Sequence, residues 1–201
     1  MDIEQHKRMH KPMMQKLTES GNEVRKTPHQ GYYIPKNTGK VIGNPSEIIY
    51  RSGWERDLCR WCDDNPAVLR WGVEIAKIEY RDPGSVSVND MKRLNLNPAD
   101  PQYWPVRSYF IDFYIEIEGD KTDTGLTVNR LLVEVKPKAQ TMRPVPPPDT
   151  AKLKEQKSFV KNCRTFLTNS AKWEAAKRWA DDHEMKFVIW TEDQLHRLGI
   201  I

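Results

Sequence analysis

The sequence predicts an α/β fold in which a mixed central sheet is flanked by helices and preceded by an extended N-terminal arm. Alternating apolar residues predict strands, and apolar residues three and four positions apart predict helices. The two kinds of element alternate along the chain, which is typical of a sheet covered by helices. The predicted strands span residues 67–80, 109–117, 131–137 and 185–191, and the predicted helices begin at residues 52, 150, 169 or 170, and 191.

Composition limits the class of protein. The 201 residues are enough for one domain with appendages, and 30% of them are charged, with a net charge of +4. Residues 1–40 hold eight Lys and Arg against four acidic residues, so the surplus lies near the N-terminus. This charge favours a nucleic acid or another acidic partner. No apolar run is long enough for a transmembrane helix, so we expect no membrane partner.

Two domains are predicted. Residues 1–44 form a basic arm with no sustained periodicity, which is either a solvated tail or a segment that orders on a nucleic acid or protein partner. Residues 45–201 form the folded domain. Three cysteines without a disulfide framework, and a start without a signal peptide, favour a cytoplasm.

The first firm helix begins at Ser52. Ser52 and Glu55 form a capping box, in which the serine hydroxyl bonds the N–H of Glu55 and the glutamate bonds back to the N–H of Ser52. This cap alone explains Glu55 without a metal. Cys59 and Cys62 form a C-x-x-C motif, but its place in mid-helix and the lack of a second pair favour core cysteines over a zinc or redox site.

The next stretch predicts a strand at residues 67–80, bent at Gly72, and then a long irregular loop. Loops of this length are usually functional, although an ordinary surface insertion is equally consistent. The candidates for contacts with a nucleic-acid backbone are Lys92, Arg93 and Arg107, with Tyr103 and Trp104 as stacking residues.

The strand at 109–117 carries an unusual acid. Asp112 lies between two aromatic residues, and a carboxylate there is costly to desolvate without a partner. A hairpin is predicted to connect this strand to Glu134, 22 residues further on. Tyr109, Ile111, Phe113, Ile115 and Ile117 are predicted to share one face, and Phe110, Asp112, Tyr114 and Glu116 the other.

The strand at 131–137 carries opposite charges at alternate positions. Glu134 and Lys136 share one face, while Leu131, Val133 and Val135 face a core. The pair is either a surface ion pair or part of a site. Two carboxylates that converge from Asp112 and Glu134 need a cation such as Mg²⁺, and a nearby lysine steadies a water and the charge on a phosphate.

The remaining chain is basic and helical. Lys138, Gln140 and Arg143 precede a polyproline segment at 144–148 that is a spacer, a docking ridge or a rim. The helix at 150–167 is predicted to turn Leu153, Phe159, Val160 and Phe166 inward. Thr191 to Gln194 reads as a second capping box.

An Asp, then Glu-x-Lys on the next strand, with a helical Glu before them, resembles the PD-(D/E)XK nuclease superfamily, whose fold is restriction-endonuclease-like. Ile111 replaces the usual proline before the Asp. The motifs at 50–55, 61–66 and 133–137, with Gln140, are similar to the head completion nucleases of contractile-tailed phages, a group that resembles the TnsA transposon endonuclease. The resemblance covers roughly residues 45 to 195.

The resemblance implies a set of roles. Asp112, Glu134 and the carbonyl of Val135 would hold one or two Mg²⁺ or Mn²⁺ ions, and Lys136 would position and activate the attacking water. Glu55 would hold a second metal or assist proton transfer, and Gln140 would be an accessory contact. Further nucleic-acid contacts would come from Lys92, Arg93, Arg107, Lys138 and Arg143.

The implied function is a metal-dependent DNA endonuclease that hydrolyses phosphodiesters of double-stranded DNA at the head–tail vertex after packaging. It would occur in the virion and the host cytoplasm, with portal or neck proteins as partners. Two alternatives stay open. One is a non-catalytic adaptor, or head–tail connector, on the same fold, and the other is a junction or repair nuclease of the same superfamily.

Overall fold

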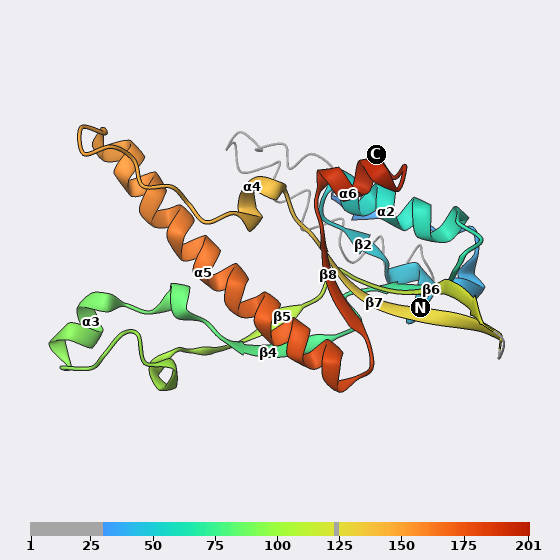
Figure 1. Cartoon of the computed structure of the whole chain (residues 1–201), viewed down its shortest axis with the longest axis horizontal. Coiled ribbons are helices and arrows are strands. Elements are labelled where there is room, and N and C mark those ends of the chain that lie inside the picture. The colour runs from blue at the N-terminus through green and yellow to red at the C-terminus, as the bar shows by residue number, and fades with distance from the viewer. Residues whose placement is uncertain (1–29, 123–124) are drawn as a thin grey trace, which may run out of the picture.

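The computed structural model describes residues 30–122 and 125–201 (Figure 1). Residues 1–29, most of the predicted arm, lie outside this part. Four strands form the central sheet in the order β3-β6-β7-β8. β3 and β6, and β6 and β7, pair antiparallel, whereas β7 and β8 pair parallel, so the predicted mixed sheet is confirmed. The strands are β3 (Val68–Val73), β6 (Phe113–Thr122), β7 (Gly125–Val135) and β8 (Lys186–Trp190).

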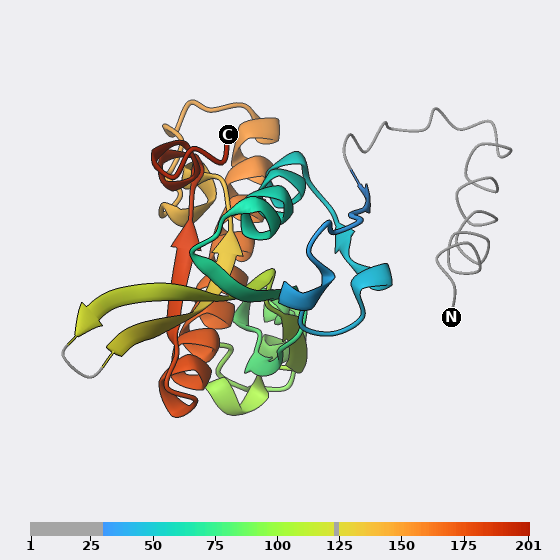
Figure 2. The same ribbon diagram turned by 90° about the vertical axis from the view of Figure 1, so that its right-hand side faces the viewer.

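Helices cover both faces of this sheet. Figure 2 shows α5 on one side and α2 with α6 on the other. The predicted hairpin is confirmed, since β6 and β7 pair directly. The helices are α2 (Gly53–Asp64), α3 (Val88–Arg93), α4 (Lys138–Thr141), α5 (Leu153–Asp182) and α6 (Glu192–Arg197).

A second, two-stranded sheet leaves the central one. It consists of β4 (Lys77–Arg81) and β5 (Val106–Phe110), which pair antiparallel and carry α3 at their far end (Figure 1). The strand predicted at 67–80, with a bend at Gly72, and the strand predicted at 109–117 are therefore each divided between two sheets. The chain turns after Val73 rather than at Gly72, because Glu74 adopts a positive φ of 51°. The Glu74 N–H bonds the carbonyl of Asp112, so both strands change sheets at one point.

The segment predicted as an irregular loop, residues 85–107, contains α3 and the short 3-10 helix η4 (Pro101–Tyr103). It begins at the end of the 3-10 helix η3 (Pro83–Ser85) and ends within β5.

Residues 30–44, the described part of the predicted arm, contact the domain. Asp63 in α2 is buried and accepts hydrogen bonds from the Tyr33 hydroxyl and from the N–H groups of Lys36 and Asn37. This segment and the residues after it form β1 (Gly31–Tyr32), η1 (Thr38–Lys40), η2 (Pro45–Glu47) and β2 (Ile49–Tyr50). The division of the chain at residue 44 stays a prediction.

α2 begins as predicted, with one difference. The Ser52 hydroxyl accepts a hydrogen bond from the Glu55 N–H at 3.2 Å, but Glu55 bonds back to the N–H of Arg51 at 2.6 Å instead of that of Ser52. Cys59 and Cys62 are buried and free, which confirms them as core cysteines. At the other end of the chain, Thr191 makes no side-chain cap, so the second capping box is wrong.

α5 is one helix where two were predicted. Asn169 does not start a new helix. It lies buried within α5, between the N-terminal half of the helix, which is mostly exposed, and the C-terminal half, which packs on the sheet. Leu153 and Val160 were predicted to face inward, yet they are 65% and 50% exposed. The apolar side of the helix therefore changes along its length: Ala175, Ala176 and Ala180 face the sheet in the C-terminal half, and the N-terminal half runs past it (Figure 1).

Two cores result from the alternation along β7. Val133 and Val135 pack with α2 and α6, and Leu131 packs against the same core, whereas Leu132 packs with α5 and the β4–β5 sheet. Side chains two residues apart share a face, so Glu134 and Lys136 project on the α5 side with Leu132. No helix in the described ranges is long and apolar enough to cross a membrane.

Candidate active site

The end of β7 presents the predicted acid and base together. The Lys136 Nζ atom lies 2.8 Å from Oε1 of Glu134, so the two side chains share a face as predicted. Glu134 is 2% exposed and Lys136 is half-buried. A surface ion pair would leave both groups in water. The buried position of the carboxylate therefore favours a site over a surface pair.

Asp112 lies beside this pair because of the change of sheet. It occupies the break between β5 and β6, where its Oδ2 atom accepts a hydrogen bond of 2.9 Å from the N–H of Val135. The predicted face pattern across residues 109–117 does not hold, since Ile111 packs on the α5 side and Phe113 on the α2 side. The break nevertheless brings Asp112 to the end of β7, as the hairpin prediction required.

Tyr109 is a site residue that the sequence reading missed. Its hydroxyl donates a hydrogen bond of 2.5 Å to Oε2 of Glu134, and burial beside that carboxylate raises the pKa of the tyrosine. Both oxygens of Glu134 are therefore held, one by Tyr109 and one by Lys136. The strand pattern placed Tyr109 on the face opposite Asp112, and no local signal indicates that β5 leaves the central sheet before residue 112.

The electrostatics of the site are those of crowded acids. Burial raises the pKa of Asp112 to about 8, and the negative charge of Glu134 adds to the rise, while Lys136 opposes it. Burial alone would lower the pKa of Lys136, but Glu134 and Asp112 outweigh it, so the pKa is raised. Lys136 thus stays an ammonium. With a pKa of about 8, Asp112 is largely protonated at neutral pH, and Lys136 balances the charge of Glu134. A bound cation would favour the ionised form of Asp112, because an opposite charge lowers the pKa of a carboxyl group.

A cleft opens between the start of α2 and the end of β7. It has a volume of about 620 Å³ and is lined by Glu55, Val135, Lys136 and Gln140, among others. Glu55 is held at the rim by the Arg51 N–H and by the Ser52 hydroxyl, which donates to its other oxygen at 2.9 Å. The charge of Glu55 contributes to the raised pKa of Asp112, but both of its carboxylate oxygens are engaged at the start of α2, so its role as a site acid stays a prediction.

The donor set suits a hard divalent ion. Mg²⁺ prefers carboxylate and carbonyl oxygens and keeps several of its waters. Asp112 and Glu134, with the carbonyl of Val135 between Glu134 and Lys136 in the chain, offer oxygens of this kind, and the raised pKa of Asp112 is the strain that such an ion would relieve. Across residues 30–122 and 125–201, no three acidic, His or Cys side chains converge to hold a metal by themselves. An ion at this point would therefore have at most two side-chain ligands, Asp112 and Glu134, and would need the Val135 carbonyl or water to complete its coordination.

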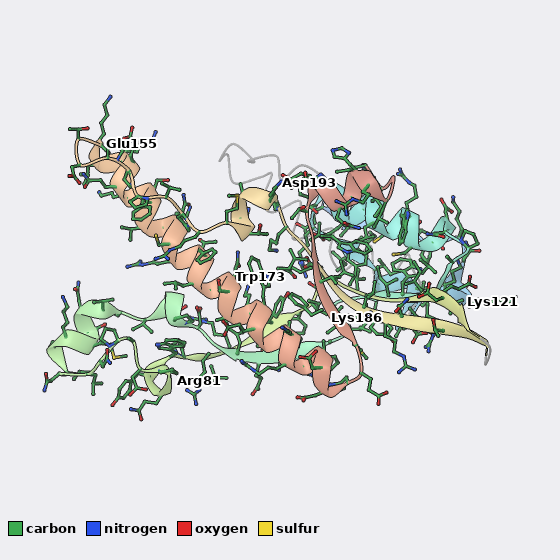
Figure 3. The ribbon with its side chains drawn as sticks, in the orientation of Figure 1. Arg81, Lys121, Glu155, Trp173, Lys186 and Asp193 are labelled. Carbon is green, nitrogen blue, oxygen red and sulfur yellow. The ribbon has the colours of Figure 1, made fainter. Side chains whose placement is uncertain are left out.

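The predicted nucleic-acid contacts are dispersed. Lys92 and Arg93 lie in α3, at the far end of the β4–β5 sheet and away from the cleft (Figure 1). Arg107 pairs with the buried Asp82 at 3.3 Å. Lys138 pairs at 2.6 Å with Asp193, the residue labelled beside α4 in Figure 3. Arg143 is exposed, one residue beyond α4 and its C-cap.

Fold and site together define the class of protein: a mixed sheet between helices, with an Asp at a strand break and Glu-x-Lys on the adjacent strand, is a PD-(D/E)XK-like nuclease scaffold. The sequence model described as TnsA-like endonuclease N terminal matches residues 65–192, and the chain belongs to this family. That match contains Asp112, Glu134 and Lys136 and begins after Glu55.

One curated relative covers most of the chain. It is the head completion nuclease of Enterobacteria phage T4, which is 33% identical over 171 residues, or 85% of this chain and 96% of the phage protein. No solved structure matches the chain.

Proposed function

We propose that this chain is a divalent-metal-dependent DNA endonuclease that acts in phage head completion. The observation that carries the proposal is the arrangement at the end of β7, where a buried Glu134 is held by Lys136 and Tyr109 beside an Asp112 of raised pKa. Membership of an endonuclease family and the printed name of the phage T4 relative support it.

The metal ion would be held by Asp112, Glu134 and the Val135 carbonyl. When bound, Mg²⁺ or Mn²⁺ would neutralise the negative charge that builds on the phosphoryl oxygens. The remaining roles belong to the chain. Lys136, charged and facing the cleft, orients the attacking water and stabilises the developing negative charge.

Three further residues position this machinery. The Tyr109 hydroxyl donates a hydrogen bond to Glu134 and holds that carboxylate beside Lys136. Glu55 holds the first turn of α2 against the cleft and adds negative charge next to Asp112. Gln140 lines the same cleft and offers an amide to a phosphate oxygen.

The test is cleavage of supercoiled plasmid by purified protein with Mg²⁺ or Mn²⁺ and with EDTA. We expect nicking that requires the metal, and a loss of about 100-fold or more in Lys136→Met, because a positioned charge at the phosphate is removed. Lys186→Met is the matched control, since Lys186 is exposed at the start of β8, beside Leu131 and away from the end of β7. A wild-type protein without activity in either metal, or a Lys136→Met variant as active as the control, contradicts the proposal.

A second function is favoured by a separate observation, the exposed apolar side chains on α5 and the segment before it. Leu153, Val160 and Leu167 are 65%, 50% and 47% exposed, and Met142 and Val145 are 62% and 84% exposed. The three on α5 lie within about 40° of one line along the helix. Exposed apolar groups that lie together are typical of protein interfaces. These side chains support an adaptor role, in which the chain binds portal or neck proteins at the head–tail vertex of the virion. This role is compatible with catalysis.

Replacing Val160 and Leu167 by Ser tests this adaptor role. We expect the variant to leave plasmid cleavage unchanged and to lower the yield of infectious particles. Normal particle yield from the variant rules the adaptor role out.

A further inference from the structure

The N-terminal half of α5 carries a concentrated positive charge. Residues 150–168 hold five Lys and Arg against Glu155 alone, a net charge of +4 that equals the net charge of the whole chain. Residues 1–40 carry a net charge of +4 as well, so the remaining residues sum to −4. Within the described residues, none of these five cations forms an ion pair. They are Lys152, Lys154, Lys157, Lys161 and Arg164.

The cations are arranged along one side of the helix. An α-helix turns about 100° per residue, so Lys154, Lys161 and Lys172 lie within about 20° of a single line. Lys157 and Arg164 lie about 60 to 80° to one side of it. Of these cations, the four in the N-terminal half of α5 are all exposed: Lys154, Lys157, Lys161 and Arg164.

The line of cations points in the direction of the sheet. Ala175 and Ala176 are buried against the α5 side of the sheet, and their positions on the helix lie on either side of the line through Lys172. The exposed apolar residues lie about 100 to 140° away from it, as the positions of Val160 and Leu167 show. The helix thus keeps one side facing the sheet, apolar where the sheet lies beneath it and basic where the helix runs past it (Figure 1).

The line leads to the candidate active site. Lys172 Nζ lies 5.4 Å from the centre of the Tyr109 ring and 5.8 Å from that of Tyr80. The hydroxyl of the same Tyr109 donates to Glu134. Glu134 projects on the α5 side of the sheet. In Figure 3, Trp173, the next residue after Lys172, marks the point where α5 meets the body, and Glu155 marks its distant end.

From this arrangement we propose that the basic side of α5 binds the phosphate backbone of double-stranded DNA and guides it to the site at the end of β7. The inference rests on the proposed function and adds a substrate-binding surface to it. Lys154 and Lys161 are unpaired and lie about 10 Å apart along the helix. Regularly spaced cations of this kind suit the repeating phosphates of a nucleic-acid backbone better than the surface of a folded protein. Binding of this kind is independent of base sequence.

The test compares two double variants that remove equal charge from the same helix. Lys154→Gln/Lys161→Gln removes two cations from the line, and Lys177→Gln/Arg178→Gln removes two exposed cations from the side that faces away from the sheet. Affinity for a fluorescein-labelled 30-base-pair duplex is measured by anisotropy in EDTA over a range of salt concentrations. Circular dichroism checks that each variant is helical.

We expect the first variant to bind about 10- to 60-fold more weakly at about 0.1 M salt. The slope of log K against log salt should fall by about 1.8, because each phosphate contact contributes about 0.9. The control should bind as the wild type does. Wild-type affinity and slope in Lys154→Gln/Lys161→Gln, or an equal loss in the control, overturns the proposal and leaves the α5 charges to a protein contact.

This experiment separates the inference from the proposed function. Binding in EDTA does not depend on cleavage, so a wild-type protein that binds through α5 yet never nicks DNA disproves only the nuclease activity. In the opposite case, cleavage with unaltered binding in the first variant disproves only the α5 surface. If both hold, the first variant should show a raised KM for plasmid with kcat unchanged.

Discussion

Asp112→Asn is predicted to stabilise the metal-free protein while abolishing its activity. Burial and the charge of Glu134 raise the pKa of Asp112 from 3.8 to about 8, so its ionised form is unfavourable in the folded state. An asparagine of the same shape still offers an oxygen to the Val135 N–H. The variant therefore keeps the hydrogen bond and removes the charge that the fold opposes.

The magnitude and the sign follow from linkage. Between about pH 4 and about pH 8 the folded state binds more protons at this carboxyl than the unfolded chain, so the stability of the wild type falls as the pH rises. At pH 7, which lies about 3 units above the pKa of the unfolded chain, this difference contributes about 4 kcal/mol. Relaxation around the site reduces this, and we expect Asp112→Asn to gain about 1 to 4 kcal/mol at pH 7 and little at about pH 4.

The assay is urea unfolding at pH 5 and pH 8, with EDTA and with Mg²⁺, followed by plasmid cleavage. Mg²⁺ should stabilise the wild type more than the variant, because the ion relieves the repulsion that the substitution has already removed. Asp63→Asn is the contrasting control. Burial would raise the pKa of Asp63, but hydrogen bonds from Lys36 and Asn37 outweigh it and lower the pKa, so this substitution should destabilise the protein.

A result of one kind refutes the reasoning. If Asp112→Asn is no more stable than the wild type at pH 8 in EDTA, and the stability of the wild type does not fall between pH 5 and pH 8, then Asp112 is not a strained carboxylate and the case for a metal at this point is lost.

Three more outcomes are expected. Tyr109→Phe leaves one oxygen of the buried Glu134 without its donor, which should cost about 1 to 3 kcal/mol in urea unfolding and lower kcat; an unchanged kcat would show that the tyrosine is only structural. Gly84→Ala places a Cβ 2.6 Å from the Arg164 carbonyl and against Thr168, so it should destabilise the protein by about 1 to 3 kcal/mol, and a neutral result would mean that η3 does not press on α5. Mg²⁺ at about 100 times its Kd should raise the wild-type stability by about 2.7 kcal/mol in the same assay, and no rise would speak against a metal site.

The candidate site was predictable where its chemistry is local. Glu134 and Lys136 are two residues apart on a strand, and their shared face follows from the period of the strand alone. Ser52 and Glu55 are three residues apart at a helix start, and the cap between them follows in the same way, although Glu55 chooses the N–H of Arg51. The mixed sheet and its hairpin were also readable from alternation.

Other features depended on contacts between distant segments. Nothing near Tyr109 in the sequence indicates that β5 pairs with β4 rather than with the central sheet, and so its bond to Glu134 could not be foreseen. The same holds for Asp63, whose partners are about 26 to 30 residues away. In α5, Leu153 and Val160 were predicted to be buried but are exposed, because an apolar stripe is buried only where another element packs against it.

By itself, the sequence determined which residues alternate, cap and carry charge, because those properties act over two to four positions. The tertiary structure alone decided that Asp112 meets Val135 at the end of β7, that Tyr109 holds Glu134, and that the basic side of α5 continues the side facing the sheet. The physical reason is that strand pairing and helix packing depend on contacts across the whole core. Only those contacts determine that the carboxylates of Asp112 and Glu134 are buried near each other.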